Sequence, residues 1–120
     1  MKTLFKETFT YKEAQCSLIS DRKIGIEIAK KSIKKNIKIL ENYISTNSKF
    51  SWTFAPLVVS DDSLVIVNMA KAAEAANVGP MAAVAGVLAD LAVADMVAAG
   101  CKVAVVEDGG EISAISNIPI

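Results

Sequence analysis

Histidine is the most informative absence from this sequence, since none of the 120 residues is one. Without an imidazole, the chain has no histidine general acid or base, no Ser–His triad, no histidine zinc ligand and no imidazole pH switch. Cysteine is almost as scarce, with only Cys16 and Cys101. Two cysteines so far apart lack the spacing of a metal site or a disulfide framework, so we interpret them as free, structural thiols.

Net charge is absent as well, because 13 basic residues balance 13 acidic ones. The balance hides an asymmetry between the two halves. Residues 1–60 carry 11 Lys or Arg against 5 Asp or Glu, a net +6, whereas residues 61–120 carry 2 against 8, a net −6. This division is compatible with a basic nucleic-acid surface, or with attraction between the halves within one chain or between copies.

Apolar residues, by contrast, are abundant: 52% of the chain is hydrophobic, and the mean hydropathy is +0.40. This composition and length predict one folded domain over residues 1–120. The longest apolar region, Met81 to Cys101, contains two aspartates and has no basic flanks, so we expect a buried helix there and no membrane partner. The first residues lack the apolar stretch of a signal peptide, and we therefore expect a cytoplasmic protein.

The basic half of the chain predicts two strands followed by a long helix. Aromatic and β-type residues indicate two short strands between Leu4 and Ser20, with Lys12–Glu13 as the turn. Asp21 stands where it could cap a helix, and the isoleucine periodicity that follows predicts an amphipathic helix from about Arg22 to Thr46. Its opposite side carries four lysines: Lys31, Lys34, Lys35 and Lys38. We interpret them as a solvated face, because a nucleic-acid surface would need arginine and aromatic side chains beside them.

The aromatic residues gather in the connection over residues 45–56, where we expect Trp52 to be a core anchor under the loop. Asp61–Asp62–Ser63 then predicts the start of a helix over residues 64–76, with its acids near the positive end of the helix dipole. Asn77–Val78–Gly79–Pro80 is typical of one helix ending and another beginning.

The helix predicted from Pro80 to Ala99 is rich in alanine and apolar on nearly every face. We expect it to be buried on several sides or packed closely on another backbone. Gly86 in its interior costs up to about 1 kcal/mol relative to alanine, and close approach of a strand, a helix or a ligand would explain it. Asp95 is expected to reach solvent, with a cleft carboxylate as the alternative. Gly100 ends the helix, and β-branched runs predict strands over residues 103–106 and 112–118.

An acidic, glycine-containing segment joins these last two strands, Glu107-Asp108-Gly109-Gly110-Glu111. A tight hairpin turn explains the two glycines, because such turns need positive φ, and spacing alone favours this interpretation. A second hypothesis is that glycine leaves backbone N–H groups free to bind a phosphate or carboxylate. The surrounding acids oppose a naked anion unless a metal bridges them. Gly79–Pro80, at a predicted helix N-terminus, is another candidate anion site.

Taken together, three segments resemble one family: Gly79 to Gly86, Ala99–Gly100, and Val105 to Ile112. They are similar to the uncharacterised ApbE-like proteins of archaea and bacteria, a branch of the superfamily named for the flavin transferase ApbE. The N-terminal Phe5-Lys6-Glu7-Thr8 and the lysine-rich helix also fit this branch, so the resemblance covers nearly the whole chain. The branch usually has Asn-Gly-Gly-Asp where this chain has Asp108-Gly109-Gly110-Glu111. Its members are also considerably longer, so that this chain corresponds to the N-terminal half of their fold.

The resemblance implies an α+β fold, incomplete relative to the family, with an antiparallel or mixed sheet and packed helices. It also implies a cytoplasmic protein that binds a flavin nucleotide or another phosphate-bearing metabolite, while any catalysis stays open. The positions implied to contact ligand are Gly79, Pro80, Asp108, Gly109 and Gly110. The clustered oxygen donors available for Mg²⁺ are Glu107, Asp108 and Glu111.

The alternative is a non-enzymatic accessory or assembly protein in sulfur or amino-acid metabolism, with the alanine-rich helix as an oligomer interface. An incomplete fold, a helix that is apolar all round and a closing strand over residues 112–120 with an unpaired edge all predict a partner. That partner is either another copy, in a homo-oligomer, or a second chain that completes the fold. Nucleic-acid binding through the lysines of the long helix is the least favoured hypothesis.

Overall fold

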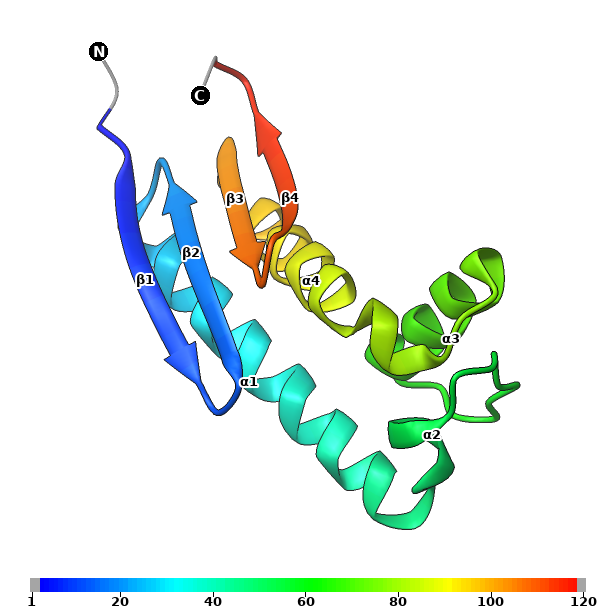
Figure 1. The fold of residues 1–120 in the computed structure, drawn as a ribbon. Coiled ribbons are helices and arrows are strands. Elements are labelled where there is room, and N and C mark those ends of the chain that lie inside the picture. Colours follow the sequence, from blue (N-terminus) through cyan, green and yellow to red (C-terminus); the bar gives the residue numbers. More distant parts are fainter. Residues whose placement is uncertain (1–2, 119–120) are drawn as a thin grey trace.

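Two hairpins and an intervening set of helices make up this chain. In the computed structural model, which describes residues 3–118, the hairpins form one antiparallel sheet in the order β1-β2-β3-β4 (Figure 1). The strands are β1 (Phe5–Tyr11), β2 (Ala14–Ser20), β3 (Val103–Asp108) and β4 (Glu111–Ser116). The helices are α1 (Lys23–Thr46), α2 (Lys49–Trp52), α3 (Leu64–Ala76), the 3₁₀ helix η1 (Pro80–Ala83) and α4 (Val84–Ala98). The predicted α+β fold is confirmed, and its sheet is antiparallel.

Both hairpins turn at the same end of the sheet through two-residue loops. The β1–β2 turn is at Lys12–Glu13, as predicted, with Lys12 at φ +54°. The β3–β4 turn consists of Gly109 and Gly110, at φ +58° and +93°. Such short loops need positive φ to match the strand twist, and glycine adopts it without a steric penalty. The backbone of the hairpin alone therefore accounts for the two glycines.

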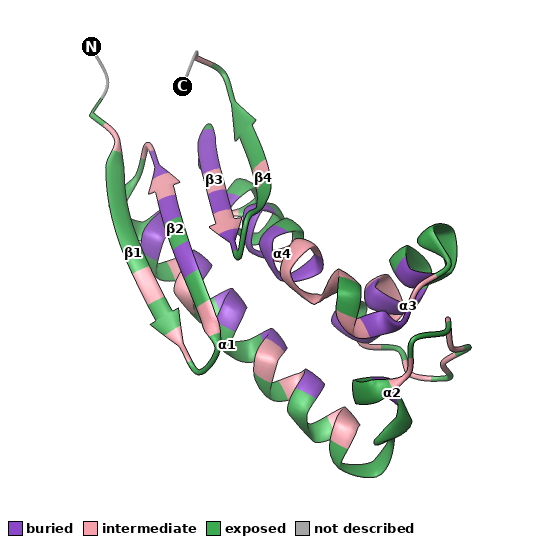
Figure 2. Ribbon diagram, viewed as in Figure 1, coloured by how far each residue is buried: buried purple, intermediate pink, exposed green. Residues whose placement is uncertain are grey.

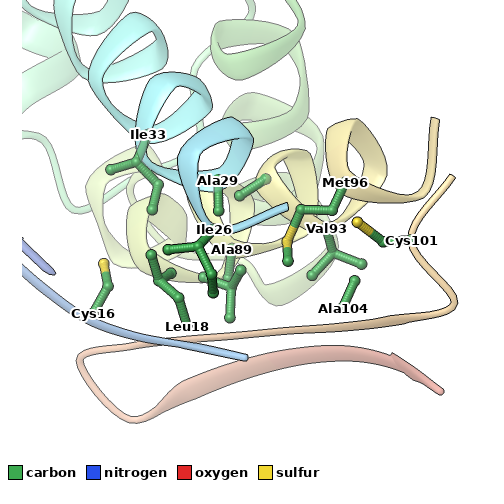
Figure 3. Close-up of a cluster of buried hydrophobic side chains, with 12 residues drawn as sticks. Cys16, Leu18, Ile26, Ala29, Ile33, Ala89, Val93, Met96, Cys101 and Ala104 are labelled. Carbon is green, nitrogen blue, oxygen red and sulfur yellow. The ribbon is translucent and has the colours of Figure 1, made fainter. Parts of the chain in front are cut away.

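Helices α1 and α4 cover one face of the sheet and contact it directly, whereas α2 and α3 lie beyond its turn end (Figure 1). Strand residues alternate between the faces, so Leu18 and Val106 point towards the helices and are fully buried. Side chains of α1 and α4 close over them in the first core cluster (Figure 3). These side chains are mostly small or β-branched: Ile26, Ala29, Ile33, Ala89, Ala92, Val93 and Met96. The alanines let both helices approach the sheet closely.

A second core cluster lies beyond the turn end of the sheet, where the C-terminal half of α1 packs against α3 and the start of α4. Phe50 is its aromatic anchor, 1% exposed and in edge-to-face contact with Tyr43 at 5.1 Å between ring centroids. Trp52 is 62% exposed, so its predicted role as a core anchor is wrong. The short helix α2 directs only one of its aromatic side chains inward, and that one is Phe50.

Helix α4 packs against α1, α3, β3 and β4, as expected for a helix with so few polar residues. Its buried residues are coloured purple in Figure 2, while Asp90 and Asp95 are exposed. The solvent interpretation of Asp95 is therefore confirmed. The segment formed by η1 and α4 (Pro80–Ala98, mean hydropathy 1.9) is long and apolar enough to cross a membrane. The core helices of globular proteins often have the same length and composition. An added Cβ at Gly86 would meet no described atom nearer than Glu111 Oε2, at 3.9 Å, so the predicted close approach of a strand or helix is wrong.

The start of α1 is tied to the connection between α4 and β3. Asp21 does not cap α1; its carboxylate instead accepts the backbone N–H groups of Lys102 and Val103, at 3.1 Å each to Oδ1. Buried Ser20 accepts the N–H of Arg22 at 3.1 Å and donates to the Cys101 thiol at 3.3 Å. These bonds join β2, α1 and β3 at a single junction.

Gly25 provides a test of how tightly this junction is packed. An added Cβ would lie 2.3 Å from Ser20 Oγ and 2.6 Å from Cys101 Sγ. We expect Gly25→Ala to destabilise the fold by about 1–3 kcal/mol, the usual range for overpacking. Gly86→Ala is the matched control and should stabilise the chain by up to about 1 kcal/mol, because its site is open and alanine favours helix. Urea unfolding measures both changes, and equal effects of the two substitutions would contradict the packing described.

Candidate functional site

A cleft of about 470 Å³ opens at the turn end of the sheet, between α1 on one side and η1 with α4 on the other. The cleft exists because helix α1 extends beyond the ends of the strands. The 24 residues of α1 span about 36 Å, whereas the 7 residues of β2 span about 23 Å. Beyond the strands, the two helical walls therefore face each other without a sheet beneath them. The volume is in the usual range of small-molecule sites.

The cleft walls are apolar and its rim is charged. The apolar wall residues are Ile37, Leu40 and Ile44 of α1 with Met81, Val84, Ala85 and Leu88 of η1 and α4. One hairpin turn adds Lys12, Glu13 and Ala14, and the other adds Asp108 and Gly109. On the rim, Lys12 Nζ forms an ion pair with both carboxylate oxygens of Glu41, at 2.8 and 2.7 Å. The positive charge of Lys12 is therefore largely neutralised.

Asp108 is the buried polar group of the cleft, with only 5% of its surface exposed. It is the last residue of β3 and lies on the helix-facing side, opposite Cys16 of β2 and Glu111 of β4. Burial raises the pKa of the Asp108 carboxyl, which the hydrogen-bonded Cys16 thiol lowers only in part. Burial and the neighbouring Asp108 raise the pKa of Cys16 to about 12, so this thiol stays protonated. Within residues 3–118, no lysine or arginine forms an ion pair with Asp108.

The residues predicted to contact ligand are only partly brought together. Asp108 and Gly109 line the cleft, and Gly110 follows them in the turn, whereas Gly79 and Pro80 do not line it. Gly79 is buried against the connection that follows α2, where an added Cβ would lie 1.9 Å from the carbonyl oxygen of Thr53. Close backbone approach therefore accounts for glycine at this position.

The three carboxylates predicted to hold Mg²⁺ are not assembled into one site. Glu107 and Asp108 are consecutive strand residues and so point to opposite faces of the sheet. Glu107 Oε1 accepts the N–H of Gly110 at 3.4 Å, while Glu111 lies near Gly86 and lines a different groove. Over residues 3–118, no group of three or more histidine, cysteine, aspartate or glutamate side chains could hold a metal ion. Strand alternation thus separates acids that are adjacent in the sequence.

The isoleucine periodicity predicted the amphipathic helix α1 but not the apolar walls of the cleft. A signal was present, since the predicted helix is much longer than either predicted strand and must extend past the sheet. The burial of Asp108 also had a signal. Ala104, Val106 and Asp108 alternate along one strand, so a core-facing Val106 places Asp108 on the same side.

Asp108→Asn tests the buried carboxyl through the pH dependence of stability. Because the pKa of Asp108 in the folded chain lies above its ordinary value of 3.8, the folded state binds the proton more tightly than the unfolded state. The stabilisation that comes from this tighter proton binding is fully present below pH 3.8. It is lost as the pH rises through the raised pKa of Asp108 in the folded state. We expect Asp108→Asn to melt at a higher temperature than the parent at pH 7, by a margin that shrinks as the pH falls towards 4. Exposed Asp95→Asn is the control, and a constant difference for Asp108→Asn would contradict the assignment.

Comparison with known proteins places this chain in a family. A family model described as AbpE bacteria matches residues 9–118. UPF0280 proteins of Methanosarcina barkeri, Methanococcoides burtonii and Methanococcus vannielii are 38%, 39% and 41% identical to it, over 116, 116 and 118 residues. These alignments cover 96%, 96% and 98% of this chain but 46%, 49% and 48% of the relatives, so the chain spans about half their length. Because the match extends over nearly all of its residues, the chain belongs to the AbpE bacteria family.

Proposed function

We propose that this chain is the ligand-binding half of an ApbE-like protein, and that its cleft holds a flavin nucleotide or another phosphate-bearing metabolite with a ring of similar size. The observation that carries the proposal is the cleft itself, with apolar walls on two helices and one buried carboxyl, Asp108. Small-molecule sites typically combine apolar walls with a few placed polar groups. The resemblance of the glycine-containing segments to ApbE-like proteins supports the choice of a flavin.

The charges around the cleft indicate how such a ligand would lie. An apolar ring fits between Leu40 and Leu88, while a phosphate group would be repelled by the Asp108 carboxylate. The phosphate therefore extends towards the rim, where Lys12 is located. A Mg²⁺ ion would be bound there by the phosphate groups, because residues 3–118 do not assemble a carboxylate site. In this proposal the chain binds and orients the ligand, and it acts in the cytoplasm, where its two unpaired cysteines stay reduced.

Thermal melting in the presence of riboflavin, FMN and FAD, with and without Mg²⁺, tests this function. A ligand that binds only the folded chain stabilises it by about 2.7 kcal/mol at 100 times its Kd. We expect Ala85→Trp, which fills the cleft, to abolish the rise in melting temperature. Ala94→Trp on the exposed side of α4 is the matched control and should keep it. If no flavin raises the melting temperature of the parent chain, the proposed ligand class is wrong.

An accessory function through a protein interface is the second candidate. The observation that favours it is a run of exposed apolar side chains around the connection between α2 and α3. Trp52, Phe54, Val58 and Leu64 are 62%, 95%, 102% and 64% exposed. Clustered exposed apolar residues are typical of interaction sites. Strand β4 also has an unpaired edge, and the sheet face opposite the helices has no described element over it (Figure 1).

Light scattering over a range of concentrations tests whether this chain associates. We expect a homo-oligomer that dissociates in the double variant Trp52→Ser/Phe54→Ser, because two large exposed aromatic side chains are removed. Ile24→Ser, at another exposed apolar position on α1, should leave the mass unchanged. A parent chain that stays monomeric at every concentration argues against self-association and leaves a different chain as the partner.

A further inference from the structure

The chemistry of Asp108 indicates which part of a ligand enters the cleft first. Among the ionisable side chains that line the cleft, Lys12, Glu13 and Glu41 are exposed on the rim, and only Asp108 is buried. A group inside the cleft therefore meets a carboxyl as its polar partner. The surrounding wall offers leucine, isoleucine, valine and methionine side chains, which provide no hydrogen bonds.

The carboxyl group has hydrogen-bonding capacity that the chain does not use. An ionised carboxylate accepts about four hydrogen bonds through its two oxygens. The Cys16 thiol supplies one weak donor, and none of the cations in residues 3–118 is paired with Asp108. A buried carboxylate with so few donors is unfavourable unless water or an occupant of the cleft supplies more. An occupant that displaces water from this carboxylate must therefore present N–H or O–H groups at this point.

The shape of the cleft narrows the choice of donor. Its two apolar walls, from α1 and from η1 with α4, face each other across the space next to Asp108. A planar ring buries both of its faces against such walls, which a phosphate group or a small ammonium ion cannot do. A ring with an N–H on its edge can pack its faces against the apolar walls and donate a hydrogen bond to the Asp108 carboxyl at the same time.

We infer that the cleft recognises the N–H edge of a planar heterocycle, such as an imide, lactam or amidine, through the Asp108 carboxyl. The ring enters edge first, and any phosphate-bearing tail remains at the rim. The ring supplies most of the affinity, because the cationic group on the rim, Lys12, is already paired with Glu41. This inference rests on the proposed function and specifies the ligand class that the same cleft takes.

The sharpest test changes the ligand and leaves the protein intact. Calorimetric titration of the 120-residue chain compares riboflavin with N3-methylriboflavin, in which a methyl group replaces the imide N–H. We expect the methylated ring to bind about tenfold more weakly or worse, the scale of leaving a buried acceptor unpaired. FMN should bind within a few-fold of riboflavin, and inorganic phosphate should not bind in the cleft.

Two variants test whether Asp108 causes the difference in affinity between riboflavin and its methyl derivative. Asp108→Leu keeps a side chain of similar shape without the acceptor, so riboflavin and its methyl derivative should bind it equally. Glu13→Leu makes the same change on the rim and should preserve the difference. Uridine and 3-methyluridine extend the comparison to an imide ring that is not a flavin.

The possible outcomes separate this inference from the proposed function. Equal binding of riboflavin and its methyl derivative by the parent chain overturns the inference while leaving flavin binding in place. Binding of FMN and inorganic phosphate without riboflavin also overturns it. If uridine binds, 3-methyluridine does not, and the flavins fail, the inference stands and the flavin proposal is wrong. If no ring compound binds, both are overturned.

Discussion

The packing of α1 and α4 on one face of a short sheet is the constraint on which the rest of this structure depends. The strands present a narrow apolar strip, and only helices with small side chains can cover it closely. Because α1 is much longer than the strands it covers, its second half extends past the sheet and needs other partners. Phe50, α3 and the start of α4 provide them in the second core cluster. The molecule is consequently elongated, 49 Å by 24 Å by 23 Å.

The candidate site is a consequence of this mismatch in length. Between the two core clusters no strand lies beneath the helical walls, and the cleft occupies the space where both hairpins turn. The turn geometry then decides which polar group reaches it, since Asp108 is the last core-facing residue before Gly109. Burial raises the pKa of the Asp108 carboxyl, and the only donor described for it is the weak Cys16 thiol. Both properties are more typical of a binding group than of a stabilising one.

Several residues that stood out in the sequence serve the fold. Gly79 allows the Thr53 carbonyl to approach, and Gly109 with Gly110 forms a tight turn. Asp21 holds the start of β3 rather than the start of α1. The local pattern predicted the glycine turn, but it did not reveal the roles of Gly79 and Asp21, because the same residue types serve both local turns or caps and long-range contacts. Only the distant contact shows which of the two applies.

Periodicity and backbone preference along the chain predicted the order of the four strands and the three long helices, the two hairpin turns and the end of α3 at left-handed Asn77, but not α2 or the separate η1. The tertiary structure alone decided which acids share a face, which aromatic side chain is buried, and where a cavity forms. Adjacent Glu107 and Asp108 differ in environment because a strand alternates its side chains and only one face of this sheet is covered. Whether a residue is buried depends on the helices that cover that face, and these come from parts of the chain that are far apart in the sequence.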